Sequence, residues 1–251
     1  MTDYPIWKNP PILEALLDIR VTLPASVEAS ALQAFSDGLK ERFPVEQPLN
    51  TVQFGFEGQP GQPPIFQAPT SDTHGYRFQS EDGYKVVQVH RGGFTFSRVG
   101  NYETWADFSQ EAHGLWQRYL ALAEPEAVTR LGLRYINRIR IPMNGGAIDF
   151  KDYLLTTPEI APDVPQELAG FFMHLVIPSA DRASFANLIQ MMEPTVPGTD
   201  TLSLIFDIDV FKMEMFEPRS ETLWQAFGTL RDFKNQIFYG SITDKTRGLF
   251  Q

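Results

Sequence analysis

Charged side chains recur at even spacing in three otherwise apolar segments of the chain. Side chains alternate between the two faces of a β-strand, so residues two or four positions apart lie on the same side. Each segment is therefore expected to carry its charges on one face of a strand. The residues concerned are Glu14, Asp18 and Arg20, then Arg130, Arg134, Arg138 and Arg140, and finally Asp207 and Asp209.

These three rows predict a ligand-binding surface. The guanidinium group of arginine is planar and donates two parallel hydrogen bonds to a carboxylate or phosphate group. We therefore expect the three strands, joined by Arg98, to form one polar sheet face that recognises an anionic small ligand or a partner protein. The alternative is a cross-strand ladder of exposed ion pairs, each of which contributes little to stability.

A metal-dependent hydrolase is the second hypothesis. Asp207 and Asp209, joined by Glu14 or Asp18, would offer the oxygen ligands that Mg²⁺ and Mn²⁺ prefer. The neighbouring arginines would compete with a cation for these carboxylates. We accordingly predict neither a metal site nor a cofactor.

No other motif indicates catalysis. The chain contains no cysteine, and therefore no thiolate nucleophile, thiolate zinc site or disulfide. Its four histidines are scattered, and it has neither a Gly-x-Ser-x-Gly elbow nor a Walker A loop. Gly55, Gly58 and Gly61 do not match the dinucleotide-binding fingerprint. The sequence therefore favours a non-catalytic binding protein, and no catalytic residue is assigned.

The strongest predicted element is a helix within residues 219–250, which would support the charged strands. Ser220 is its predicted N-cap, and Gly240 is predicted to end it because glycine enters the left-handed conformation without steric cost. Ser241 or Thr243 is then expected to cap a last helical turn. The apolar face of the helix, with steps of three and four, comprises Leu223, Phe227, Leu230, Phe233 and Ile237.

The remaining segments predict an α+β fold in which antiparallel sheets pack on long helices. Further helices are expected over 26–43 and 104–122, with a short helical turn in 149–155. Apolar content alone would also permit a helix over 184–192, and the segment 58–64, rich in glycine and proline, is a predicted loop. The predicted strands cover 12–23, 51–57, 76–79, 84–90, 94–99, 127–141, 170–177, 184–192 and 201–215.

The order of these elements nearly repeats, as β-α-β-β-β-β-α followed by β-α-β-β-β-α. We therefore expect residues 1–251 to form one compact unit made of two helix-grip-like halves, 10–125 and 126–251, that are a tandem pseudo-repeat. A faint sequence echo between 18–24 and 137–142 supports the duplication. The alternative is a single α+β domain without duplication.

Composition and charge narrow the class of partner. The chain has 251 residues, of which 43% are hydrophobic, so it is long enough to bury a core without disulfides. Its net charge of −10 disfavours a broad nucleic-acid surface. Neither a signal peptide nor an apolar run long enough to span a membrane is visible. We therefore expect a cytoplasmic protein that binds a small anionic ligand, another protein or further copies of itself.

Four motifs of the chain resemble those of a bacterial protein family. They lie at 10–15 (Pro-Pro-Ile-Leu-Glu-Ala), 133–139, 206–211 and 238–245, and the two terminal motifs are the more specific. The chain is similar over its whole length to this family, which is sporadically distributed and uncharacterised. The resemblance implies a complete family member and brings no activity, cofactor or catalytic residue with it. The sporadic distribution supports a third hypothesis, a subunit of a defence or toxin-neutralising complex.

Overall fold

A nine-stranded sheet forms the centre of the computed structural model, which describes residues 4–5, 7–53, 56–57, 65–66, 70–143, 148–194 and 198–251. Its strand order is β2-β5-β6-β7-β1-β8-β11-β10-β9, and every neighbouring pair is antiparallel. The α+β class is as predicted, with one continuous sheet. The strands are β1 (Ile12–Thr22), β2 (Val45–Gln53), β5 (Thr70–Gln79), β6 (Lys85–His90), β7 (Gly93–Val99), β8 (Ala127–Pro142), β9 (Phe172–Pro178), β10 (Phe185–Met192) and β11 (Thr201–Lys212), with β3 (Phe56–Glu57) and β4 (Ile65–Phe66) paired separately.

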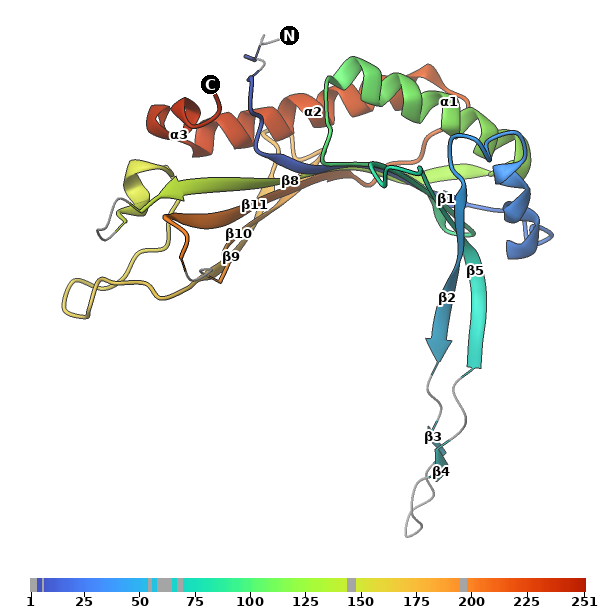
Figure 1. Cartoon of the computed structure of the whole chain (residues 1–251). Coiled ribbons are helices and arrows are strands. Elements are labelled where there is room, and N and C mark those ends of the chain that lie inside the picture. Colours follow the sequence, from blue (N-terminus) through green and yellow to red (C-terminus); the bar gives the residue numbers. More distant parts are fainter. Residues whose placement is uncertain are drawn as a thin grey trace.

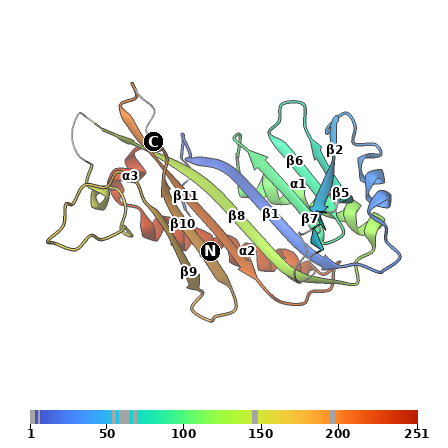
Figure 2. The same cartoon turned by 90° about the horizontal axis from the view of Figure 1, so that it is seen from below.

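Two helices, α1 (Trp105–Ala123) and α2 (Glu221–Ser241), lie on the same face of this sheet (Figure 1). Figure 2 looks onto the opposite face, where the strands lie in front and the helices behind them. We call this second surface the open face, meaning the side of the nine strands that points away from α1 and α2. The other described helical elements are the 3-10 helices η1 (Ala29–Ser36) and η2 (Phe150–Asp152) and the short helix α3 (Asp244–Gly248). Among the described residues, no helix combines the length and the apolar character that crossing a membrane requires.

The hydrophobic core lies between the sheet and these two helices. Along β8, Leu131, Leu133 and Tyr135 are almost fully buried, and the residues between them are less buried except for Gly132. This alternation is the two-residue period of a strand with one covered face. From α2, Leu223 and Phe227 fill the space above the sheet, as their helical spacing predicted.

Two helix predictions are wrong in detail. The segment 26–43 contains η1 and turns instead of a continuous α-helix, although Leu32 and Phe35 are buried as expected. Their spacing of three suits the three-residue turn of a 3-10 helix, and Gly38, with a φ of 72°, stands in the left-handed region just beyond it. Gly240 does not end α2, which continues to Ser241, and Thr243 then caps α3.

Strand β2 begins at Val45, well before the predicted strand 51–57. The segment 184–192, which by apolar content could have been a helix, forms strand β10. Gly55, Gly58, Gly61 and the predicted loop 58–64 lie outside the described residues.

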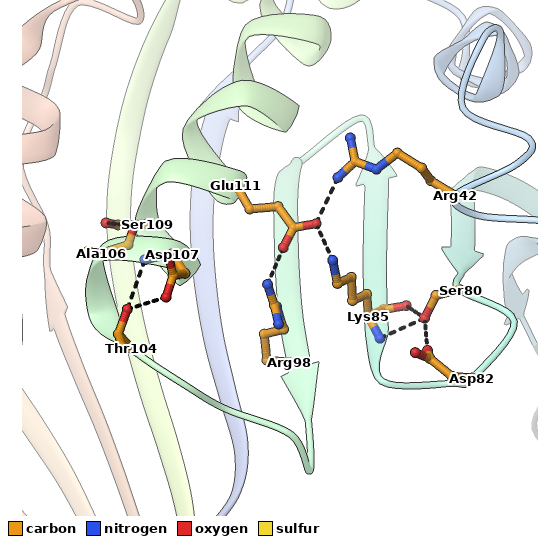
Figure 3. A network of polar contacts seen from close by, with 10 residues as sticks. All are labelled: Arg42, Ser80, Asp82, Lys85, Arg98, Thr104, Ala106, Asp107, Ser109 and Glu111. Atoms are coloured by element: carbon orange, nitrogen blue, oxygen red, sulfur yellow. Dashed lines mark hydrogen bonds and ion pairs between the residues drawn. The ribbon is translucent and has the colours of Figure 1, made fainter. Parts of the chain in front are cut away.

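A partly buried ion cluster fixes α1 over β6 and β7 (Figure 3). Glu111 of α1 accepts hydrogen bonds from Arg42, Lys85 and Arg98 at 2.7, 2.9 and 2.5 Å. Burial would raise the pKa of Glu111, but the hydrogen bond from Lys85 and the charges of Arg98 and Lys85 together lower it below its usual value. Because Arg98 stands opposite the buried Ala15 and reaches α1, our prediction that it joins the charged strand rows is wrong.

Candidate functional site on the open face

The charged residues singled out on the three strands all lie on the open face. Directly opposed residues of an antiparallel pair point to the same side of a sheet. Arg134 of β8 stands opposite Asp209 of β11 on one side and Leu16 of β1 on the other, and it alternates with buried residues that face the helices. The same register places on this face Glu14, Asp18, Arg20, Arg130, Arg134, Arg138, Asp207 and Asp209.

Asp18 is the centre of the first group of contacts. It is buried, and its Oδ2 accepts hydrogen bonds from Arg20 Nε and Arg130 Nη1, both at 2.9 Å. Thr95 Oγ1 of β7 donates to its Oδ1 at 3.0 Å. Opposite Asp18 stands Gly132, where a Cβ atom would lie 2.7 Å from Arg130 Nη1. The glycine therefore leaves the space through which Arg130 reaches β1.

Polar contacts continue from Arg130 to the edge of the sheet. Arg130 Nη2 lies 3.5 Å from Asp209 Oδ2, and Asn187 Nδ2 of β10 donates to the same oxygen at 3.3 Å. His174 Nε2 of the edge strand β9 lies 3.3 Å from Asn187 Oδ1. An unbroken row of side-chain contacts thus crosses the open face from β1 to β9.

Burial affects the ionisation of two groups on the open face, His90 of β6, which lies beside Arg20, and Asp209 of β11. The pKa of His90 is lowered to about 4, mainly by burial and to a smaller extent by the charge of Arg20, while the charge of Asp18 acts in the opposite direction. The imidazole, 3.4 Å from Arg20 Nη1, is therefore neutral at physiological pH. Burial also raises the pKa of Asp209, against the opposing charge of Arg130. The ionised form of Asp209 thus depends on its arginine partner.

Two further arginines each bind a carboxylate with two donors. Arg134 Nε and Nη2 donate to the two oxygens of Asp207 at 2.9 and 2.6 Å. The side chain of Asp207 is only 8% exposed, whereas that of Arg134 is 41% exposed. The hydrogen bond to Asp207 is the main reason why the pKa of Arg134 is raised. Arg138 Nε and Nη2 bind Glu193, which follows β10, at 2.7 and 2.9 Å.

The structure separates some of the residues that share this face. Arg138 pairs with Glu193 and not with either aspartate. Glu14 makes no side-chain hydrogen bond or ion pair within the described residues, although its charge helps to raise the pKa of Arg134. Arg140 is exposed and forms no ion pair with any residue that the structure describes. Glu193 was missed, but its even spacing from the open-face positions of β10 is a signal that could have identified it.

The aspartate pair is engaged by cationic side chains of the chain itself. Arg134 occupies both oxygens of Asp207, and Arg130 and Asn187 share Asp209. A divalent ion between the two carboxylates would have to displace these guanidinium groups, which favours the ion-pair interpretation. The described ranges contain no group of three or more potential ligands placed to hold a metal ion.

Comparisons with known proteins do not identify a family or a function for this site. No model of a known protein family matches the chain, and no curated protein matches it. The resemblance inferred from the four sequence motifs therefore stays a prediction, and the functional argument rests on the geometry of the site.

Proposed function

We propose that this chain is a non-catalytic binding protein that recognises a partner protein through the open face. The observation that carries the proposal is a row of arginines that are paired within the chain and yet remain partly exposed. The exposed fraction of the side chain is 47% for Arg20, 41% for Arg134 and 32% for Arg138. A guanidinium group has five N–H donors, so pairing with one carboxylate leaves donors for a partner.

Apolar side chains between the arginines supply a second component of such an interface. Ile136, Ile189 and Ile205 are half-buried on the open face. Arg130 lies over the ring of Phe211, with its guanidinium carbon 4.8 Å from the ring centre. Arginine and aromatic residues are enriched at the centre of protein interfaces, which supports recognition of another protein.

A partner protein suits this face better than a small anion does. A free anion binds arginine best through two parallel donors, and Asp207 and Glu193 already occupy one such pair of donors on Arg134 and on Arg138. Displacing Arg134 would leave Asp207 nearly buried and unpaired, and breaking a fully buried pair costs about 3–5 kcal/mol. A partner protein can instead use the remaining donors and the apolar residues without breaking a pair.

We further infer that residues 10–125 and 126–251 are the helix-grip-like halves of a tandem pseudo-repeat within one compact unit. In each half the opening strand pairs with the strand that precedes the long helix, β1 with β7 and β8 with β11. The two opening strands pair with each other at the junction. This common plan supports a single recognition surface to which both halves contribute, with Asp18 and Arg130 meeting at their boundary.

The test compares two double variants that remove equal charge. Arg134→Ala with Arg138→Ala alters the open face, whereas Arg182→Ala with Arg219→Ala alters two exposed arginines that lie in turns. Each tagged protein is used to co-purify partners from the native host, after circular dichroism has established that it is folded. We expect one protein to be recovered with the wild type and the turn variant, and lost with the open-face variant.

A third variant separates recognition from stability. Ile136→Ser changes the open face but leaves all its ion pairs in place, so loss of the same partner supports the proposal. Equal recovery by all variants, or loss with the turn variant as well, contradicts it.

A further inference from the structure

A cavity of about 130 Å³ lies on the helix side of the sheet, away from the open face. Its walls come from the N-terminal segment (Tyr4, Pro5, Trp7 and Pro10), the residues before α1, strand β8 and helix α2. Trp7 contacts Phe238 and Phe250, with ring centres 5.8 and 4.9 Å apart, and Tyr4 stacks on Tyr239 at 4.4 Å. These aromatic contacts fix the N-terminal segment against α2 as one wall of the cavity.

Lys234 of α2 lines this cavity without a carboxylate partner. Its Nζ lies 4.0 Å from the centre of the Tyr135 ring, and within the described residues it makes neither a hydrogen bond nor an ion pair. Burial first, and then repulsion from Arg231, lowers the pKa of Lys234 to about 7. An unpaired lysine in such surroundings destabilises the fold, and groups of this kind concentrate at functional sites.

Two neighbouring groups also favour an anionic ligand. Asn235 is buried and lines the cavity, yet its amide makes no hydrogen bond in the described part of the chain. Arg231 lines the cavity as well, and among the described residues its one ion pair is a 3.9 Å contact with Asp232. Two cationic side chains, Arg231 and Lys234, therefore line the cavity, and the one acidic lining residue is the exposed Glu103.

We propose that this cavity binds a small organic carboxylate with a flat apolar body, whose carboxylate lies between Lys234, Arg231 and the Asn235 amide. The aromatic walls, which include Trp7 and Phe238, would contact the body of the ligand. An apolar cavity of roughly 150 Å³ binds one benzene molecule, so the volume fits a single ring. The inference does not depend on the open face and adds a small-molecule site to the proposed binding protein.

Binding of a carboxylate is coupled to protonation of Lys234. Burial raises the pKa of Tyr102 and Tyr135, and that of Tyr239 to about 12, so these phenols stay neutral near pH 7. A bound carboxylate stabilises the ammonium form of Lys234. If only this form binds, the affinity falls about tenfold between about pH 6 and pH 8. The other titratable side chains lining the cavity are Tyr4, Tyr102, Glu103, Tyr135, Arg231 and Tyr239.

The probe for this site is benzoate, with benzamide as its neutral counterpart and inorganic phosphate as a second anion. Calorimetric titration at about pH 6 and about pH 8, in buffers of different ionisation enthalpy, reports the affinity and the protons taken up. The full chain is compared with Lys234→Met, which keeps the side-chain length and removes the charge. Lys40→Met, at an exposed site, is the matched control.

We expect the wild type and Lys40→Met to bind benzoate with proton uptake and about tenfold more tightly at the lower pH. Lys234→Met should lose at least about tenfold in affinity, and Arg231→Gln should weaken binding in the same direction. Absence of benzoate binding to the wild type up to about 10 mM overturns the proposal. Equal binding of benzamide, tighter binding of phosphate than of benzoate, or unchanged binding by Lys234→Met overturns it as well.

Discussion

Replacing Lys234 by methionine is predicted to make the protein more stable. The pKa of this lysine falls from 10.5 to about 7 in the folded chain, because burial and then Arg231 disfavour its charge. A pKa difference of one unit corresponds to about 1.36 kcal/mol, so the full difference amounts to about 5 kcal/mol of destabilisation. Because the side chain is not fully enclosed, we expect about half of this value. Methionine has similar length and no charge to desolvate.

The sign of the pH dependence follows from the direction of this shift. Below about pH 7 the lysine is charged in both the folded and the unfolded chain, so the full destabilisation is present. Between about pH 7 and 10.5 the unfolded chain binds more protons than the folded chain, so the wild type gains stability as pH rises. The advantage of Lys234→Met should therefore shrink by about 1–2 kcal/mol between about pH 7 and pH 9.

Urea denaturation of the wild type, Lys234→Met and Lys40→Met at these pH values measures the difference directly. Lys40→Met should follow the wild type at each pH, since Lys40 is exposed. A destabilised Lys234→Met, or a stability difference that does not change with pH, would show that folding does not leave Lys234 as an unpaired, desolvated cation and would refute this reasoning.

Other substitutions test the ion pairs and the metal hypothesis. Arg134→Met should destabilise the fold by about 2 kcal/mol in urea denaturation, because the nearly buried Asp207 loses its partner. Asp207→Asn should cost less stability because Arg134 reaches solvent, and equal losses from the two variants would contradict this account. Glu111→Gln should lower the melting temperature by several degrees, equivalent to about 2 kcal/mol, because three cations lose their shared carboxylate. An unchanged melting temperature would mean that this ion cluster does not stabilise the fold. Mg²⁺, Mn²⁺ and Zn²⁺ should leave the melting temperature of the wild type unchanged, since arginines hold the two aspartates; a rise that Asp207→Asn abolishes would favour the hydrolase hypothesis.

Much of the architecture was predictable because its signals are local. Alternation along 127–141 located β8, and the helix expected over 104–122 is α1, where the Thr104 hydroxyl accepts a hydrogen bond from the Asp107 amide. The helical spacing of Leu223 and Phe227 identified the buried face of α2. The prediction of an α-helix over 26–43 was wrong because buried apolar residues three positions apart fit an α-helix and a 3-10 helix equally well.

The site was only partly predictable, because pairing depends on register and on loops. Alternation put Arg134 and Asp207 on strand faces, but only the strand order brings β8 beside both β1 and β11. Asn187 was missed because an uncharged side chain in a strand leaves no pattern. Lys234 was missed for a different reason: its helix position alone is ordinary, and only the folded chain brings it into one cavity with residues of the N-terminal segment.

Carboxyl-group footprinting of the captured complex tests the central claim, contact through the open face, most directly. Asp209 and Glu193 are each 25% exposed in the free chain, whereas Glu217, which precedes α2, and Glu221, its first residue, are both exposed. Mass spectrometry should show that partner binding reduces labelling of Asp209 and Glu193 and leaves Glu217 and Glu221 unchanged. Protection confined to Glu217 and Glu221, with the open-face carboxylates labelled as in the free chain, would contradict the proposed recognition surface.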